Sequence, residues 1–195
     1  LTALDSLKVV VQGLKSWKDA GIPVYAIGGS HDWSASGKSL LEVLEAGGLL
    51  KNVMNGSFSP DGKLILEPVR DEKTGTWLTG IGGRRQGLEL EMFQSLDRES
   101  LEKVSGQKIF LFHGMIEELK PKGLDGVKSV PLSLFPKGWS YYAGGHLHKR
   151  IQLPINTSTG SMLVYPGPLF PESFSELEEL GHGSFVIFED FVPKY

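Results

Sequence analysis

Four of the five histidines in the sequence lie at glycine-containing turns where short apolar runs end. In chain order they are His31, His113, His146 and His148. Imidazole is the commonest metal ligand in proteins, and the chain has no cysteine, so a bound metal would be held by nitrogen and oxygen atoms. The pattern therefore predicts a metal centre of that kind. The fifth histidine, His182, is interpreted as a turn residue.

Each of these turns ends a run with the composition of a buried strand. The runs are IPVYAIGG at 22–29, QKIFLFHGMI at 107–116 and WSYYAGGHLHKR at 139–150. Ligands of open α/β sheets bind beyond the carboxyl ends of the strands, so we expect the turns to converge on one site. His146 and His148 are two residues apart, which places both side chains on one face of an extended backbone.

The elements that must position these residues alternate between helices and strands. Apolar spacing predicts helices at 4–20, 36–48 and 97–106. Alternating and turn-rich segments predict hairpins at 64–82 and 151–167, and a last strand at 184–190. This order indicates an α/β domain. Because the chain opens on a helix, we expect the first strand of the domain to lie upstream of it.

Composition limits the class of protein. The chain has 195 residues, of which 40% are hydrophobic and 22% charged, and its mean hydropathy is −0.09. These values are typical of one globular domain. No apolar run approaches the about 20 residues that span a bilayer, and no signal peptide is recognisable, so we expect a soluble, cytoplasmic protein. The net charge of −3 argues against indiscriminate coating of nucleic acid but permits a local basic groove.

Three motifs of this sequence resemble the last three motifs of the calcineurin-like metallophosphoesterases. They are GGSHDW, LFHGMI and AGGHLHKR, in the family's order. Two longer segments, GSHDWSASGKSLLEVLEAGG and VYPGPLFPESFSELEELGHGSFVIFE, are most similar to the SbcD / Mre-eleven (meiotic recombination) double-strand-break repair nucleases. The resemblance implies a four-layer α/β/β/α sandwich, in which two mixed sheets are flanked by helices.

The resemblance also implies what the sequence lacks. The family's first two motifs, which include the carboxylate that bridges its metals, are expected upstream of Leu1. Residues 1–195 are therefore interpreted as a metallophosphoesterase (nuclease) domain without its first strands and first two motifs. Either a longer protein or a second chain is expected to supply them. This segment alone is expected to be inactive.

The activity that the resemblance implies is a metal-dependent DNA exonuclease or endonuclease of double-strand-break repair. In the reaction that it implies, water activated by two divalent ions attacks the phosphodiester. These ions are usually Mn²⁺, and Zn²⁺, Fe²⁺ and Mg²⁺ are the alternatives. The resemblance assigns His113 and His146 to one metal and His148 to the other. It makes His31 the catalytic group that assists attack and leaving-group departure, with Asp32 orienting it.

Ser30 departs from the family pattern, which has an asparagine ligand at this position. A hydroxyl is a weaker ligand than an amide carbonyl. Three outcomes are therefore expected for Ser30: weak binding to the metal, binding through a water molecule, or no binding. Two basic pairs, Arg84 with Arg85 and Lys149 with Arg150, are candidate contacts to DNA phosphates. The resemblance further implies a coiled-coil ATPase partner of the SbcC or Rad-fifty type, a homodimer, and a nucleoid-associated location, or a nuclear one in a eukaryote.

Two other functions are compatible with the motifs. The first is a metallophosphoesterase acting on another substrate, such as a nucleotide or a phosphoprotein, which the net negative charge favours. The second is a degenerate phosphoesterase domain that serves as a scaffold, which Ser30 and the expected upstream location of two motifs favour.

Overall fold

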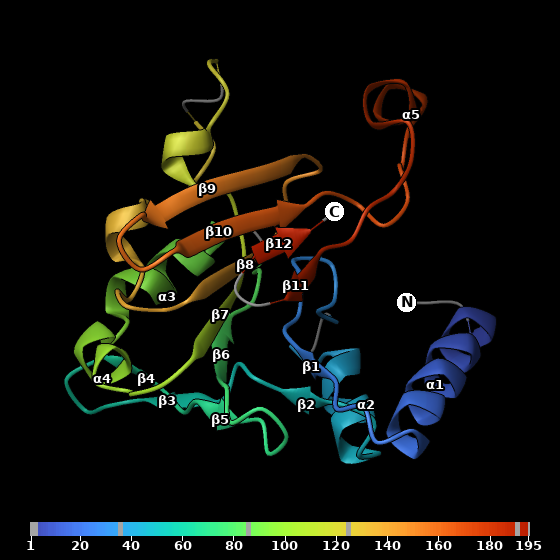
Figure 1. Cartoon of the computed structure of the whole chain (residues 1–195), viewed down its shortest axis with the longest axis horizontal. Helices are drawn as coiled ribbons and strands as arrows, with labels where there is room; N and C mark the ends of the chain where they lie inside the picture. The colour runs from blue at the N-terminus through green and yellow to red at the C-terminus, as the bar shows by residue number, and fades with distance from the viewer. Residues whose placement is uncertain (1–3, 35–36, 85–86, 124–125, 190–191, 195) are drawn as a thin grey trace.

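A six-stranded mixed sheet is the main element of the computed structural model, which describes residues 4–34, 37–84, 87–123, 126–189 and 192–194 (Figure 1). Its strand order is β5–β6–β7–β8–β10–β9. The strands are β5 (Val69–Arg70), β6 (Trp77–Ile81), β7 (Lys108–His113), β8 (Tyr141–Gly145), β10 (Ser161–Pro166) and β9 (Arg150–Asn156). The four inner strands are parallel, while β5 and β9 are antiparallel at the edges.

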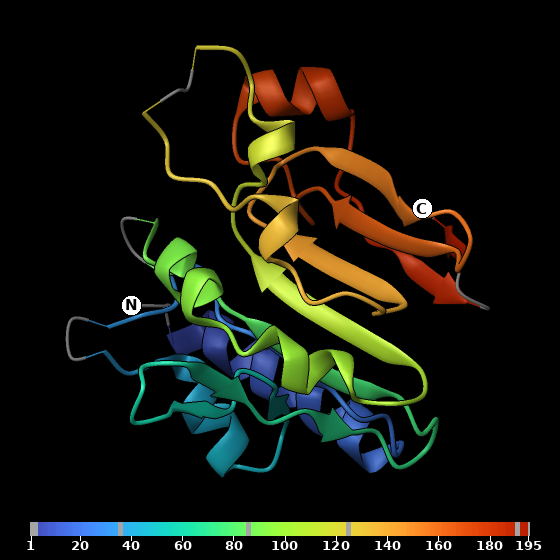
Figure 2. The same ribbon diagram turned by 90° about the vertical axis from the view of Figure 1, so that its left-hand side faces the viewer.

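Smaller pairs of strands surround this sheet. β1 (Tyr25–Ala26) is parallel to β2 (Lys51–Asn52), β3 (Gly56–Phe58) is antiparallel to β4 (Leu64–Leu66), and β11 (Ile187–Glu189) is antiparallel to β12 (Val192–Lys194). The helices are α1 (Leu4–Asp19), α2 (Leu40–Ala46), α3 (Glu89–Ser95), α4 (Arg98–Glu102) and α5 (Phe174–Leu180), with short 3-10 turns η2 (Glu117–Leu119) and η3 (Leu132–Leu134). In Figure 2, α1 and α2 lie at the bottom of the molecule and α5 at the top.

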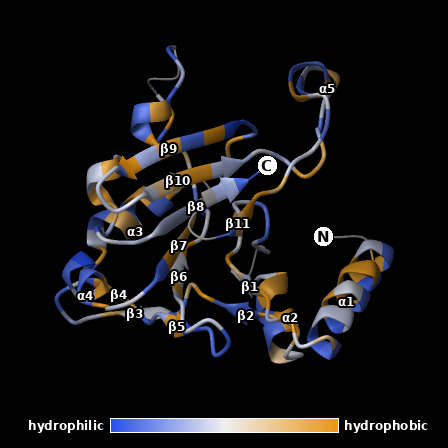
Figure 3. Ribbon diagram, viewed as in Figure 1, coloured by the Kyte–Doolittle hydropathy of each residue, from blue (hydrophilic) through white to orange (hydrophobic). Residues whose placement is uncertain are grey.

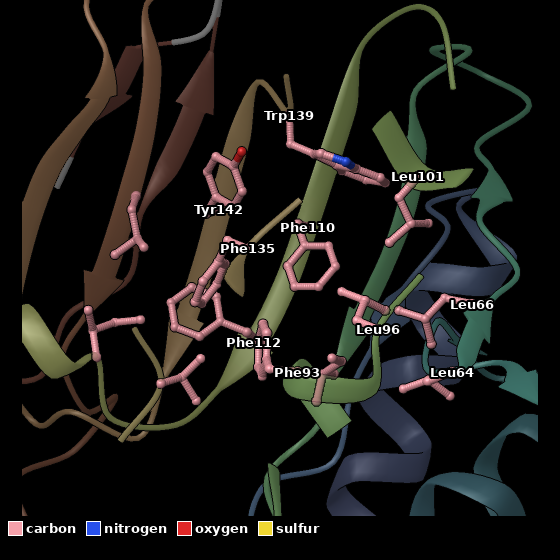
Figure 4. Close-up of a cluster of buried hydrophobic side chains, with 14 of the residues drawn as sticks. Leu64, Leu66, Phe93, Leu96, Leu101, Phe110, Phe112, Phe135, Trp139 and Tyr142 are labelled. Atoms are coloured by element: carbon pink, nitrogen blue, oxygen red, sulfur yellow. The ribbon is translucent and has the colours of Figure 1, made fainter. Parts of the chain in front are cut away.

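The main hydrophobic core covers one face of the sheet. Along β7, buried and half-buried residues alternate, as expected for a strand with its two faces in different surroundings. Phe110 and Phe112 project from its buried face into a group of aromatic and leucine side chains (Figure 4). The ring of Phe112 meets that of Phe135 edge to face, with centroids 4.9 Å apart. Each such buried ring stabilises the fold by about 2–3 kcal/mol.

A second, smaller core lies between α1 and α2. Leu14 of α1 packs with Leu41 and Leu44 of α2 and with Leu50. Other apolar residues of these helices, among them Val9, Trp17 and Val43, are exposed. Hydrophobic and hydrophilic residues alternate along α1 (Figure 3).

The observed elements confirm an α/β fold, and several of them match the sequence prediction. Helix 4–20 is α1, and hairpin 151–167 is β9–β10. Hairpin 64–82 is only partly correct, because the predicted first strand is two strands. Pro68 has no N–H to donate to a ladder and separates β4 from β5, and β4 pairs with β3 instead.

Other elements are shorter than expected or were not predicted. The strand expected at 22–29 has ladder pairing at Tyr25 and Ala26 only, where it lies beside β2. The helix expected at 97–106 is α4, which is five residues long. Neither α3 nor α5 was predicted. Within the described ranges, every helix is too short or too polar to cross a lipid bilayer.

Candidate functional site

His113 and His146 come together at the carboxyl ends of two neighbouring parallel strands. His113 is the last residue of β7 and is paired with Gly145, the last residue of β8. His146 follows directly, so its ring meets that of His113 edge to face, with ring centroids 5.2 Å apart. The expectation that strand ends bring these histidines together is thus correct for this pair.

The imidazole of His113 is surrounded by glycines from three separate segments. A Cβ added to Gly83, after β6, would lie 2.4 Å from Cδ2 of His113. At Gly145 the added Cβ would lie 3.0 Å from Nδ1, and at Gly29, after β1, 3.1 Å from Cε1. Glycine is needed at Gly83 in particular, because a larger residue would collide with the ring.

Burial keeps both rings neutral. It lowers the pKa of His113 to about 4, with the nearby His146 as the next cause, while the charge of Asp32 acts in the opposite direction. Burial also lowers the pKa of His146, and the charge of Glu89 opposes this. A neutral imidazole carries a free lone pair, which is the form that binds a metal ion.

The backbone of His146 is strained. Its φ is 96°, and among the described residues it is the one non-glycine residue with a positive φ. Such a conformation costs on the order of 1–3 kcal/mol and is found mainly at functional sites. The chain thus leaves the extended conformation directly after β8, at the residue whose ring contacts that of His113.

The turn after β1 brings His31 to the same place. Ser30, His31, His113 and His146 line one pocket of about 650 Å³. Asp32 accepts a hydrogen bond from the backbone N–H of Gly29, with 2.6 Å between Oδ2 and N. The carboxylate of Asp32 therefore stabilises the turn that presents His31, and a direct contact with the His31 ring stays a prediction.

Three further side chains of this pocket carry charge. They are Arg84, Glu89 and Lys128. The guanidinium carbon of Arg84 lies 3.8 Å from the ring centroid of Trp33, whose indole N–H donates to the carbonyl of Gly83 at 2.7 Å. Glu89 and Lys128 were not predicted, because neither belongs to a recognisable motif and both reach the pocket through tertiary packing. The Arg85 candidate lies outside the described residues.

His148 is not among the residues that line this pocket, and it contacts α5 instead. Its Nδ1 is 2.7 Å from Oε1 of Glu176. His148 is close enough to His113 and His146 that its charge contributes to lowering the pKa of both. Extended pairing does not continue from His146 to His148, since β8 ends at Gly145 and β9 begins at Arg150.

Lys149 and Arg150 are engaged within the chain. Nζ of Lys149 lies 3.4 Å from Oε1 of Glu179. Arg150 donates from Nη2 to the carbonyls of Leu180 and His182, at 3.1 and 2.9 Å. Contact of these two residues with DNA stays a prediction.

The donor set provides one side of a metal site. Among the described residues, no three His, Asp or Glu side chains lie close enough to hold an ion by themselves. The pair of neutral rings, His113 and His146, fits a divalent ion that receives further ligands from outside this set.

Comparisons with known proteins find several relatives that match most of the chain. The chain is 28% identical over 180 residues to the DNA double-strand break repair protein Mre11 of Methanococcus maripaludis, which covers 90% of this chain and 44% of that protein. The protein of the same name from Aeropyrum pernix is 30% identical over 189 residues, covering 94% and 44%. That of Archaeoglobus fulgidus is 28% identical over 170 residues, covering 83% and 36%. No family model matches the chain.

These similarities cover most of the chain and place it in the metallophosphoesterase superfamily. Within that class it belongs to the Mre11/SbcD family. The chain spans less than half the length of the relatives that it matches.

Proposed function

We propose that this chain is part of the nuclease domain of a DNA double-strand-break repair protein and acts as a metal-dependent DNA phosphodiesterase. The observation that carries the proposal is the pocket that His31 shares with His113 and His146. It joins a solvent-exposed imidazole to two neutral imidazoles. The family relatives, whose names describe double-strand-break repair, support DNA as the substrate.

The cofactors in this proposal are two divalent metal ions. Mn²⁺ is preferred, and Zn²⁺, Fe²⁺ and Mg²⁺ are the alternatives. His113 and His146 hold one ion and His148 the other, with Ser30 as a weak or water-mediated ligand. Carboxylate ligands beyond those of the described residues would complete the site. When bound, such ions supply hydroxide from water and stabilise the charge of the phosphoryl oxygens.

His31 is the acid of the proposed reaction. Its exposed side chain lies in the pocket rather than against the protein, so it reaches the phosphodiester and passes a proton to the departing oxygen. Asp32 acts through the turn, because its hydrogen bond to Gly29 holds the backbone that carries His31.

Arg84 and Lys128 form the cationic side of the pocket in this proposal. Both line it, and Arg84 is held by its stacking on Trp33. A phosphate backbone entering the pocket would be paired by these two side chains. Arg85, Lys149 and Arg150 are further candidates, of which the last two must first leave their present partners.

The larger assembly is also proposed. In this proposal the described sheet and its helices belong to a four-layer α/β/β/α sandwich. A homodimer is supported by the outward-facing apolar side chains Val9, Val10 and Trp17 of α1 and Val43 of α2. A coiled-coil ATPase of the SbcC or Rad-fifty type is the proposed partner, at the nucleoid or in a nucleus.

Cleavage of labelled duplex DNA by the full-length protein with Mn²⁺ tests the proposal. His31→Ala should lower the cleavage rate by about 10²–10⁴-fold and leave the Mn²⁺ stoichiometry unchanged. His182→Ala is the matched control, because His182 is exposed and does not line this pocket. Equal cleavage by His31→Ala and the unaltered protein would contradict the assignment.

A scaffold role is the second candidate, and one observation favours it: the described residues do not form a complete metal site. Stoichiometric binding of two Mn²⁺ ions by the full-length protein would rule it out. Nucleotides and phosphoproteins, assayed beside DNA, decide whether the enzyme acts on another phosphoester.

A further inference from the structure

α5 and the loop after it contact three successive residues that follow β8. His148 meets Glu176, Lys149 meets Glu179, and Arg150 donates to the carbonyl of Leu180. Figure 1 shows α5 set apart from the sheet, past the end of β10 and connected to it by a loop. Among these contacts, the one between His148 and Glu176 joins α5 to a proposed metal ligand.

The carboxylate of Glu176 is fixed from two sides. Its Oε2 accepts a hydrogen bond from the backbone N–H of Glu172 at 2.8 Å, and Oε1 lies 2.7 Å from Nδ1 of His148. The backbone N–H of Glu176 donates to Oγ of Ser173, which caps α5. A capped helix and a backbone donor therefore hold the carboxylate in place before any ligand binds.

Both oxygens of the Glu176 carboxylate face a nitrogen atom. Oε2 faces the backbone N–H of Glu172, and Oε1 faces Nδ1 of His148. An ionised carboxylate only accepts hydrogen bonds, so the ring nitrogen that faces it must carry a hydrogen. That nitrogen is Nδ1, which leaves the lone pair of His148 on Nε2.

We propose that Glu176 is a positioning residue for His148: it holds the hydrogen of the imidazole on Nδ1 and thereby presents Nε2 to a metal ion. The inference rests on the proposed function, in which His148 is a ligand. Carboxylates in this second position fix the ring and raise the basicity of the ligand, and their loss typically weakens metal affinity about 10–100-fold. No motif of the sequence pointed to Glu176, which lies 28 residues after His148.

The alternative is that the contact only fastens α5 to the sheet. Glu179 allows the two to be separated, because it belongs to the same helix and pairs with Lys149 but not with an imidazole. A fastening role predicts similar effects of Glu176→Gln and Glu179→Gln. A positioning role predicts an effect on the ring of His148 for Glu176→Gln alone.

The first experiment measures the tautomer in the metal-free, full-length protein labelled with ¹⁵N-histidine. At a pH where the rings are neutral, the two ¹⁵N shifts of His148, assigned with His148→Gln, should show hydrogen on Nδ1. Glu176→Gln should shift this signal toward a mixture of tautomers, and Glu179→Gln should not. Ser173→Ala removes the cap but keeps the carboxylate, so it reports any effect of a loosened helix.

The second experiment is a calorimetric titration with Mn²⁺. Glu176→Gln should weaken the binding of one ion about 10–100-fold, with Glu179→Gln close to the unaltered protein. An unchanged tautomer together with unchanged Mn²⁺ affinity in Glu176→Gln would overturn the role of Glu176. Failure of the unaltered protein to bind Mn²⁺ or cleave DNA would instead overturn the proposed function, while the tautomer still decides what Glu176 controls.

Discussion

The rings of His113 and His146 meet edge to face with their centroids 5.2 Å apart, although one ends β7 and the other follows β8. The parallel register places Gly145 opposite His113, and glycine leaves room for the ring. The next residue, His146, then turns back at a φ of 96°. The backbone conformation of His146 thus brings the two lone-pair donors together at a cost in stability.

Replacing His146 should therefore separate stability from metal binding. Glycine adopts a φ of 96° freely and alanine does not, so His146→Gly should be more stable than His146→Ala by about 1 kcal/mol. Both variants should bind Mn²⁺ more weakly than the unaltered protein. Urea unfolding and Mn²⁺ titration measure the two effects, and an alanine variant as stable as the glycine variant would contradict the strain.

Gly83→Ala should damage the His113 site directly. Its Cβ would lie 2.4 Å from Cδ2 of His113 and 2.7 Å from the backbone nitrogen of Ser30, so ring or backbone must move. We expect a loss of about 1–3 kcal/mol in the free energy of unfolding and weaker Mn²⁺ binding. Gly126→Ala is the control, since Gly126 lines the same pocket with open space around its Cα. Similar behaviour of the two variants would argue against the glycine cradle.

The free energy of unfolding should depend on His113 in acid. Its pKa is about 4 in the folded protein and ordinarily 6.5, so the unfolded chain binds the proton more strongly between these values. The stability that the neutral ring confers is complete above about pH 6.5 and is lost as the pH falls toward 4. We expect the loss to be on the order of 2 kcal/mol, allowing for the partial solvent exposure of the ring.

Urea unfolding of the metal-free protein at several pH values between 4 and 7.5 measures this dependence. His113→Gln removes the titrating group and keeps a polar side chain, so its stability should fall less steeply over the same range. Parallel curves for the two proteins would show that His113 is not the source of the acid sensitivity.

Much of the site could be predicted because its residues stand at the ends of recognisable strands. Local sequence patterns mark these positions: glycine turns precede His31 and His146, and an apolar run ends in His113. The structure has the same turns and the same strand end. Glu89, Lys128 and Glu176 could not be predicted, since each reaches the site from an element that no local pattern links to it. Asp32 shows the same limit: its neighbour in sequence is His31, yet its hydrogen bond is to Gly29.

The fold could be predicted from the sequence to a similar extent as the site. The prediction of a helix was correct for α1, because its apolar residues recur at helical spacing over several consecutive turns. The prediction of one strand around Pro68 was wrong. The alternating apolar residues are typical of a single strand, but proline has no N–H to donate and separates β4 from β5. α5 has few buried contacts of its own and is held by Arg150 and neighbouring side chains, which the local sequence does not reveal.

Arg84 and Lys128 should contribute to DNA binding through charge. Each phosphate contact releases condensed counterions, so removing one should lower the slope of log affinity against log salt by about 1 on duplex DNA. Arg84→Ala should have the larger effect on affinity, because stacking on Trp33 holds its guanidinium in place, whereas Lys128 pairs only loosely with Glu91 at 3.6 Å.

Binding is measured in a His31→Ala background to prevent cleavage. Lys15→Ala is the control, since Lys15 pairs with Asp19 on the exposed face of α1 and does not line the pocket. Equal salt slopes for Arg84→Ala, Lys128→Ala and Lys15→Ala would contradict a phosphate-binding role for this side of the pocket.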